Sequence, residues 1–166
     1  MELYIVRHGI AVDREDPKCP SDTERFLTDE GIEKSRQVAK GVAEVASVPD
    51  LILTSPYLRA VQTAEIFAEI LEYSKHKIRK SDLLLPGAEP LQLFRELAKD
   101  KDLSSVFVFG HAPHLDDLVA TSINTKHHIS SLKKAGVAFV QLKRLSPPSG
   151  ELIWLATPKL LRKAGK

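Results

Sequence analysis

Short apolar runs and longer amphipathic stretches alternate along this chain. Continuous runs of strand-favouring residues at 3–6, 50–55 and 105–110 predict strands that are covered on both faces. The segment 76–84 contains more polar residues and predicts a weaker strand. Buried strands of this kind are typical of parallel sheets that carry helices on both sides.

Between the strands, apolar residues recur at helical spacing. Thr28 is a good N-cap for a helix over residues 29–46, because acidic residues follow it in the first turn. Ser55 is expected to cap a helix over residues 56–72, since proline is favoured at the first helical position. Two further helices are expected, over residues 90–99 and 115–123.

Two apolar segments near the carboxyl end, "GVAFVQLKRL" and "ELIWLA", flank "SPPSG" and predict a pair of antiparallel strands. The whole pattern predicts an α/β fold: a three-layer sandwich with a mostly parallel central sheet, helices on both faces and an antiparallel C-terminal strand pair. Because no repeat or linker interrupts it, residues 1–166 are expected to form one domain. The basic segment after Leu160 is interpreted as a solvated end.

Composition narrows the classes of function. The 166 residues include 24 Lys+Arg and 22 Asp+Glu, and a formal charge of +2 is too small to predict binding to nucleic acid. Cys19 is the only cysteine, so the sequence predicts neither an internal disulfide nor a thiolate metal site. The amino end does not resemble a signal peptide, and no apolar stretch approaches the roughly 18 residues of a membrane span. We therefore expect a cytoplasmic monomer with no membrane partner.

The predicted strands end in residues that can do chemistry. Arg7, His8 and Gly9 follow the first strand, Arg59 follows the second within the first turn of a helix, and His111 follows the strongest strand. In open α/β sheets, ligands bind beyond the carboxyl ends of the strands. Two arginines and two histidines are therefore expected to converge on one side of the sheet.

Such a cluster suits a phosphoryl group. Guanidinium groups present forked donors that match phosphate oxygens, and Arg59 adds its charge near the positive end of a helix. A neutral imidazole among these cations has its protonated form disfavoured, so it can act as a nucleophile and accept the phosphoryl group. A second imidazole, protonated, can donate to a phosphoryl oxygen and stabilise the transition state. This chemistry requires neither a metal nor a cofactor.

Three ordered motifs, "VRHG", "LTSPYLRAVQTAEI" and "VFGHAPHL", resemble the signatures of the histidine phosphatase superfamily, which includes the cofactor-dependent phosphoglycerate mutases. The segments "LTDEGIEKSRQVA" and "LIWLATPKLL" are most similar to its SixA branch, the phosphohistidine phosphatases. The resemblance implies a phosphoglycerate-mutase-like fold in which His8 is transiently phosphorylated. It also implies that Arg7 and Arg59 bind the phosphate and that His111 completes the pocket.

The sequence offers no certain general acid. Larger members of the superfamily protonate the departing alcohol with a carboxylic acid, and Glu89 in "PGAEP" is the nearest candidate; its alternative role is that of a residue at a helix start. An alkoxide is a poor leaving group and needs that proton, whereas imidazole, with a pKa of about 6.5, leaves far more readily. A site without a committed acid is therefore expected to favour phosphorus bound to nitrogen.

Three functions follow from these residues. The first is a metal-independent phosphatase that removes phosphate from phosphohistidine in a partner protein, such as a phosphorelay domain, through a covalent intermediate on His8. The second is a small-molecule phosphomonoesterase with Glu89 as its acid. The third is a non-catalytic module that binds phosphorylated proteins, against which the presence of both His8 and His111 argues, since binding alone needs only the arginines.

Two other groups of residues receive structural interpretations. His114, Asp116 and Asp117 are expected at a helix start on the rim of the site, where they shape access for the substrate. Phe139 and Trp154 are expected to pack on the strands.

Overall fold

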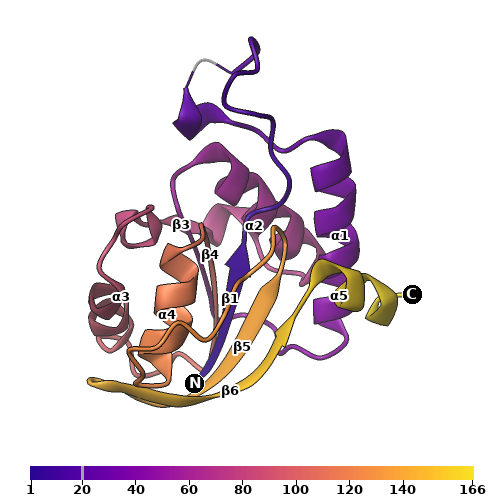
Figure 1. Ribbon diagram of the computed structural model, residues 1–166. Coiled ribbons are helices and arrows are strands. Elements are labelled where there is room, and N and C mark those ends of the chain that lie inside the picture. The colour runs from indigo at the N-terminus through magenta and orange to yellow at the C-terminus, as the bar shows by residue number, and fades with distance from the viewer. Residues whose placement is uncertain (20) are drawn as a thin grey trace.

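The computed structural model describes residues 1–19 and 21–166. A six-stranded sheet in the order β3-β2-β4-β1-β5-β6 forms its centre (Figure 1). The strands are β1 (Glu2–Arg7), β2 (Leu51–Thr54), β3 (Arg79–Lys80), β4 (Ser105–Gly110), β5 (Val137–Leu145) and β6 (Pro148–Ala156). β1 to β4 pair in parallel, whereas β5 runs antiparallel to both β1 and β6. The predicted mostly parallel sheet with an antiparallel C-terminal strand pair is confirmed.

Helices cover both faces of the sheet (Figure 1). They are α1 (Asp29–Ala43), α2 (Leu58–Ile70), α3 (Pro90–Leu97), α4 (His114–Ser122) and α5 (Pro158–Ala164). Leu3 and Ile5 of β1 belong to the core under α3 and α4, while Tyr4 and Val6 belong to the core under α1, α2 and α5. Successive side chains of a strand point to opposite faces, so each central strand supplies both cores. This is the predicted three-layer sandwich.

Aromatic side chains fill part of the second core. Tyr4 lies between the rings of Phe107 and Phe139, with centroid distances of 4.3 and 4.6 Å, and the Trp154 ring lies 5.7 Å from that of Phe139. These contacts join β4, β1, β5 and β6 across the sheet, because the four residues come from four neighbouring strands. The predicted packing of Phe139 and Trp154 on the strands is confirmed.

Two local predictions need correction. The segment 76–84 forms a strand only at Arg79–Lys80, between the 3-10 turns η2 (Lys75–Lys77) and η3 (Asp82–Leu84), because too few apolar side chains hold it on the sheet. The second helix begins at Leu58, and its N-cap is Tyr57 without a side-chain hydrogen bond. Thr28, in contrast, accepts a hydrogen bond from the Gly31 amide at 3.0 Å, as expected of an N-cap.

The carboxyl-terminal segment is a helix and not a solvated tail. α5 buries Leu161, which is 5% exposed, against α1. A side chain at Gly41 of α1 would place its Cβ 1.9 Å from the Leu161 carbonyl oxygen, so glycine allows the two backbones to meet. Within the described residues, no helix is both long and apolar enough to cross a membrane.

Candidate active site

Three neighbouring strands bring the predicted site together. β4 lies between β1 and β2, and Arg7 at the end of β1 is in register with Gly110 at the end of β4. The backbone continues this register, since the His8 amide donates to the Gly110 carbonyl at 3.0 Å. The rings of His8 and His111 consequently lie 5.1 Å apart. The convergence expected from the strand ends is observed.

The contacts of His8 specify which ring nitrogen carries the proton. Nδ1 lies 2.7 Å from the Gly9 carbonyl oxygen, which can only accept, so Nδ1 carries the hydrogen. Nε2 lies 3.3 Å from Nε of Arg59, which can only donate, so Nε2 keeps its lone pair. His8 is therefore a neutral imidazole whose lone pair lies on Nε2, beside the Arg59 guanidinium. This is the form that a nitrogen nucleophile requires.

Burial keeps His8 in this form. The side chain is 6% exposed, and its pKa is lowered to about 3, first by burial and then by the charges of Arg59, Arg7 and Lys134. The hydrogen bond to Gly9 opposes this shift but does not outweigh it. The neighbouring cations, from which the neutral form was predicted, are thus the smaller cause, and exclusion from water is the larger one.

Arg59 is a buried arginine held by the segment that precedes α1. It is 4% exposed; its Nη1 donates to the backbone carbonyl of Asp22 at 2.7 Å, and its Nη2 lies 3.5 Å from an oxygen of the Asp22 carboxylate. The three guanidinium nitrogens thus face either residue 22 or Nε2 of His8. A phosphoryl group on His8 Nε2 would lie directly beside this guanidinium.

Asp22 is a carboxylate of the site that was not predicted from the sequence. Burial alone would raise its pKa, but a hydrogen bond from Arg25 and the charges of Arg59 and Arg14 lower the pKa below its usual range. Asp22 is therefore ionised at neutral pH and holds no proton to donate to a leaving group. The position of Asp22 in the site depends on the path of the loop before α1, and the apolar periodicity of the sequence does not predict that path.

Arg7 is oriented by a second loop. Its Nη1 donates to the Leu132 carbonyl at 2.7 Å. The Leu132 amide in turn donates to Asp116 at 2.9 Å, and Asp116 also accepts a hydrogen bond from Ser130 at 2.7 Å. Asp116, expected on the rim, is instead a buried anchor for this loop, 8% exposed. Among the described residues, Arg7 Nε has no partner, so this donor is available to a bound oxygen.

His111 is paired with the serine that was expected to cap α2. Its Nε2 lies 2.8 Å from Ser55 Oγ, and the Tyr57 ring meets its ring edge-on at a centroid distance of 5.1 Å. Its pKa is lowered to about 3 by burial and then by His8 and Arg59, so the expected protonated imidazole is neutral in the free site. Ser55 therefore orients His111 and does not begin the helix. His114, also expected on the rim, is buried and 3% exposed.

Gly9 and Thr63 connect His8 to the helix that carries Arg59. The Gly9 amide donates to Thr63 Oγ1 at 3.0 Å, and Thr63 donates to the Arg59 carbonyl at 2.7 Å. A side chain at Gly9 would place its Cβ 2.4 Å from Ser35 Oγ on α1. Glycine at this position thus allows α1 to approach the loop that bears His8.

Glu89 lies at the start of α3 and is exposed. Its carboxylate accepts a hydrogen bond from the Leu91 amide at 3.3 Å, which is the contact of an N-cap. Of its two candidate roles, this contact corresponds to the residue at a helix start. In the described part of the chain, no group of three His, Cys, Asp or Glu side chains is arranged to hold a metal ion.

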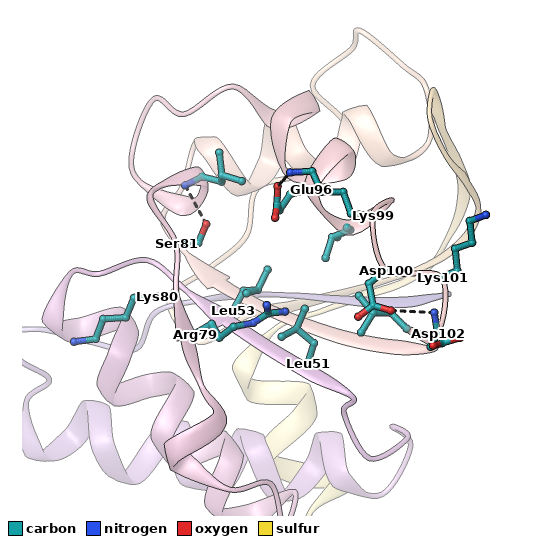
Figure 2. Close-up of a pocket in the computed structure, with 13 residues that line it drawn as sticks. Leu51, Leu53, Arg79, Lys80, Ser81, Glu96, Lys99, Asp100, Lys101 and Asp102 are labelled. Atoms are coloured by element: carbon teal, nitrogen blue, oxygen red, sulfur yellow. Dashed lines mark hydrogen bonds and ion pairs between the residues drawn. The ribbon is translucent and has the colours of Figure 1, made fainter.

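A cavity of about 790 Å³ lies away from this cluster, along the β3 edge of the sheet (Figure 2). Leu51 and Leu53 of β2 form its floor, and charged side chains of both signs surround it, including an ion pair between Lys99 and Glu96 at 2.5 Å. We call it the edge cavity. None of the four clustered residues lines it, and its charges largely compensate one another, so it offers no comparable chemistry.

Comparison with known proteins agrees with this geometry. Residues 3–83 match the family model described as the histidine phosphatase superfamily, branch 1. The phosphohistidine phosphatase SixA of Escherichia coli is 30% identical over 126 residues, which cover 72% of this chain and 73% of that protein. The chain belongs to the histidine phosphatase superfamily. Its similarity to SixA makes it a phosphatase of that superfamily, and the predicted resemblance is confirmed.

Two further similarities extend over nearly the full length of the chain. A structure of the protein histidine phosphatase SixA complexed with tungstate superposes with a TM-score of 0.85 at 27% identity, covering 97% of this chain and 99% of that one. An uncharacterized protein of a Picosynechococcus strain is 37% identical over 171 residues, covering 97% of this chain and 99% of its own. The phosphoglycerate-mutase-like fold is thereby confirmed.

The buried histidines predict how stability depends on pH. The native state keeps His8 and His111 neutral down to about pH 3, whereas the unfolded chain protonates them near pH 6.5. Their contribution is therefore complete above about pH 6.5 and is lost as the pH falls from there toward 3, at up to about 1.4 kcal/mol per pH unit for each histidine. Urea unfolding at several pH values should show a shallower acid slope for the double variant His8→Gln/His111→Gln. Parallel curves for the two proteins would contradict the pKa assignment.

Proposed function

We propose that this chain is a metal-independent phosphatase that removes phosphate from phosphohistidine in a protein, through a covalent phosphoryl intermediate on His8. The observation that carries the proposal is the neutral His8 imidazole, with its lone pair on Nε2 and the Arg59 guanidinium beside that atom. The similarity to the phosphohistidine phosphatase SixA supports the same reaction.

In the first step, His8 Nε2 attacks phosphorus and the bond from phosphorus to the substrate imidazole breaks. The departing nitrogen keeps the bonding electron pair and takes a proton from water. Arg59, whose guanidinium lies beside Nε2, and Arg7, whose charge acts on His8 and whose Nε has no partner among the described residues, bind the phosphoryl oxygens. His111 donates a hydrogen bond to the same group, and the charge of the bound phosphoryl raises the affinity of its ring for a proton.

In the second step, water attacks phosphorus and the bond to His8 Nε2 breaks; the attacking water gives up one proton, which neutralises the hydroxide that the first step left in solution. Orthophosphate leaves, and Nε2 regains its lone pair. The Gly9 carbonyl holds the proton of Nδ1 throughout, so the ring returns to the same tautomer. Each turnover thus consumes one water and leaves the enzyme unchanged.

Neither of the two candidate carboxyl groups among the described residues is placed to give a proton to a leaving group, and this favours phosphohistidine over phosphate esters. Asp22 is ionised, and the carboxylate of Glu89 binds the start of its own helix. An imidazole can leave without a proton donor in the site. An alkoxide leaves more slowly by the rate factor of roughly 10² to 10⁴ that general acid catalysis supplies. A protein substrate also fits the small chain, in which the segment between β3 and α3 consists of a 3-10 turn and a short loop and carries no cap over the site.

The test compares two peptides of one sequence, the first with phosphohistidine and the second with phosphoserine at the same position. Phosphate release should be about 10² to 10⁴ times faster from the phosphohistidine peptide, expressed as kcat/KM. Glu89→Gln should leave both rates unchanged. If the phosphoserine peptide reacts equally fast and Glu89→Gln slows it, the chain is instead a phosphomonoesterase with Glu89 as its acid.

A further inference from the structure

A second cavity adjoins the candidate active site and is strongly basic. It has a volume of about 570 Å³, and we call it the basic cavity. It is lined by Arg7, Ile10, Lys34, Lys133, Lys134, Ala135, Thr157, Pro158, Lys159 and Arg162. Arg7 belongs to both the basic cavity and the phosphate site, so the two share a wall.

The backbone fixes the basic cavity to the catalytic strand end. The Ala135 amide donates to the carbonyls of Arg7 and His8, at 3.1 and 3.0 Å. Lys133 and Lys134 immediately precede this anchor, and they follow Leu132, whose carbonyl holds Arg7. Lys134 is near enough for its charge to lower the pKa of His8. A ligand in the basic cavity therefore lies beside any phosphoryl group on His8.

The positive charge of the basic cavity is not neutralised within the protein. Lys133, Lys134 and Lys159 are exposed, and none of them forms an ion pair with any residue that the structure describes. Two cations at the wall are partly compensated: Lys34 pairs with Glu30, and the charge of Arg162 acts on the same carboxylate. Three lysines remain for an external anion.

The opposite side of the active site differs. There Arg14, Arg25 and Arg59 all surround the Asp22 carboxylate, with nitrogen to oxygen distances of 3.2, 3.1 and 3.5 Å. Asp13, Glu15 and Asp16 line a cavity there beside Arg14 and Arg25, so together with Asp22 they offset the three arginines and leave little free positive charge on that side. An acidic partner that reaches the phosphate site is consequently attracted from the side of the basic cavity.

We propose that the basic cavity docks a carboxylate-rich segment of the protein that carries the phosphohistidine. The proposal rests on the proposed function, because it requires a protein substrate. Separate ammonium groups spread around a cavity of this size suit several carboxylates along a chain better than one compact phosphate. Ile10, Ala135 and Pro158 add apolar wall against which a peptide can pack.

The test uses phosphohistidine peptides that differ only in their flanking residues, with three glutamates in one and three glutamines in the other. Wild type should prefer the glutamate peptide in kcat/KM by about three- to tenfold at low salt, and the preference should shrink as salt rises. The variant Lys133→Glu/Lys159→Glu should abolish or reverse the preference. Lys99→Glu/Lys101→Glu, the same charge change at the edge cavity, should leave the preference intact.

Binding of the unphosphorylated glutamate peptide, followed by NMR or calorimetry, separates docking from catalysis. If neither phosphohistidine peptide is hydrolysed but the Lys133→Glu/Lys159→Glu variant still weakens this binding, docking stands and the proposed function fails. Equal kcat/KM values of wild type for the glutamate and glutamine peptides would overturn the docking proposal. The proposal would also be overturned if the control variant Lys99→Glu/Lys101→Glu lost the preference to the same extent. A protein that binds tripolyphosphate but not the glutamate peptide would overturn it as well.

Discussion

Replacing His8 with alanine is expected to reduce phosphate release from a phosphohistidine peptide by at least about 10³-fold, to near the uncatalysed rate. Among the residues described, Nε2 of His8 is the ring nitrogen that presents its lone pair directly to a guanidinium, that of Arg59. His111 is not expected to substitute for it, because its Nε2 is engaged with Ser55 and no guanidinium contact is found for its ring in the described part of the chain. Steady-state assays with phosphohistidine peptides measure the loss.

His127→Ala is the matched control, since His127 is an exposed histidine outside the site. It should retain the full rate. Rapid denaturation of wild type during turnover should also trap an acid-labile phosphoryl group on His8, detectable by intact mass. Retention of activity in His8→Ala would exclude the covalent mechanism. A wild-type protein that binds the phosphopeptide without turnover would instead be the binding module considered from the sequence.

Replacing Arg59 with alanine is expected to lower kcat/KM by about 10² to 10³, the effect typical of removing one preorganised donor from a transition-state site. Arg59→Lys should recover only part of this loss, because an ammonium keeps the charge without the fork. Loss of the guanidinium also removes the donor beside His8 Nε2 and the buried partner of Asp22.

Arg95→Ala, at an exposed arginine of α3, serves as the control and should react at the wild-type rate. Because Arg59 is buried, thermal unfolding must accompany the assay to separate lost chemistry from lost folding. The inhibition constant of tungstate, which binds a related SixA, gives a readout of the anion site alone. It should rise in Arg59→Ala. A change of less than threefold in both kcat/KM and the tungstate constant would refute the role.

The sequence was sufficient for the parts of the site that depend on strand order. Arg7, His8 and His111 each follow a buried apolar strand, and parallel strands place their carboxyl ends at one edge. Arg59 was predictable because it lies within the first turn of the helix after β2. These positions follow from local patterns together with one topological rule.

The remaining contacts depend on loop paths that no periodicity encodes. Asp22 meets Arg59 across 37 positions of sequence, and the Leu132 carbonyl meets Arg7 across 125. Ser55 was expected to cap α2, but the helix begins three residues later; its hydroxyl accepts a hydrogen bond from the Tyr57 amide at 3.3 Å and also contacts His111, a tertiary contact that local preference does not predict. Thr157 followed by Pro158 is a signal for the start of α5. The helix has only seven residues and buries one leucine, so it lacks the apolar periodicity that predicts a longer helix.

Asp22 also affects the release of orthophosphate, the product. Without a ligand, Arg59 already has an internal anion, so orthophosphate must compete with the Asp22 carboxylate and carbonyl for the same guanidinium. As phosphate departs, the Asp22 oxygens can accept hydrogen bonds from the buried Arg59 guanidinium, so its charge always has a partner. Such an exchange stabilises the empty state relative to the phosphate-bound one, so we expect weaker product inhibition. A carboxylate that donates no proton to the reaction is thus expected to speed product release.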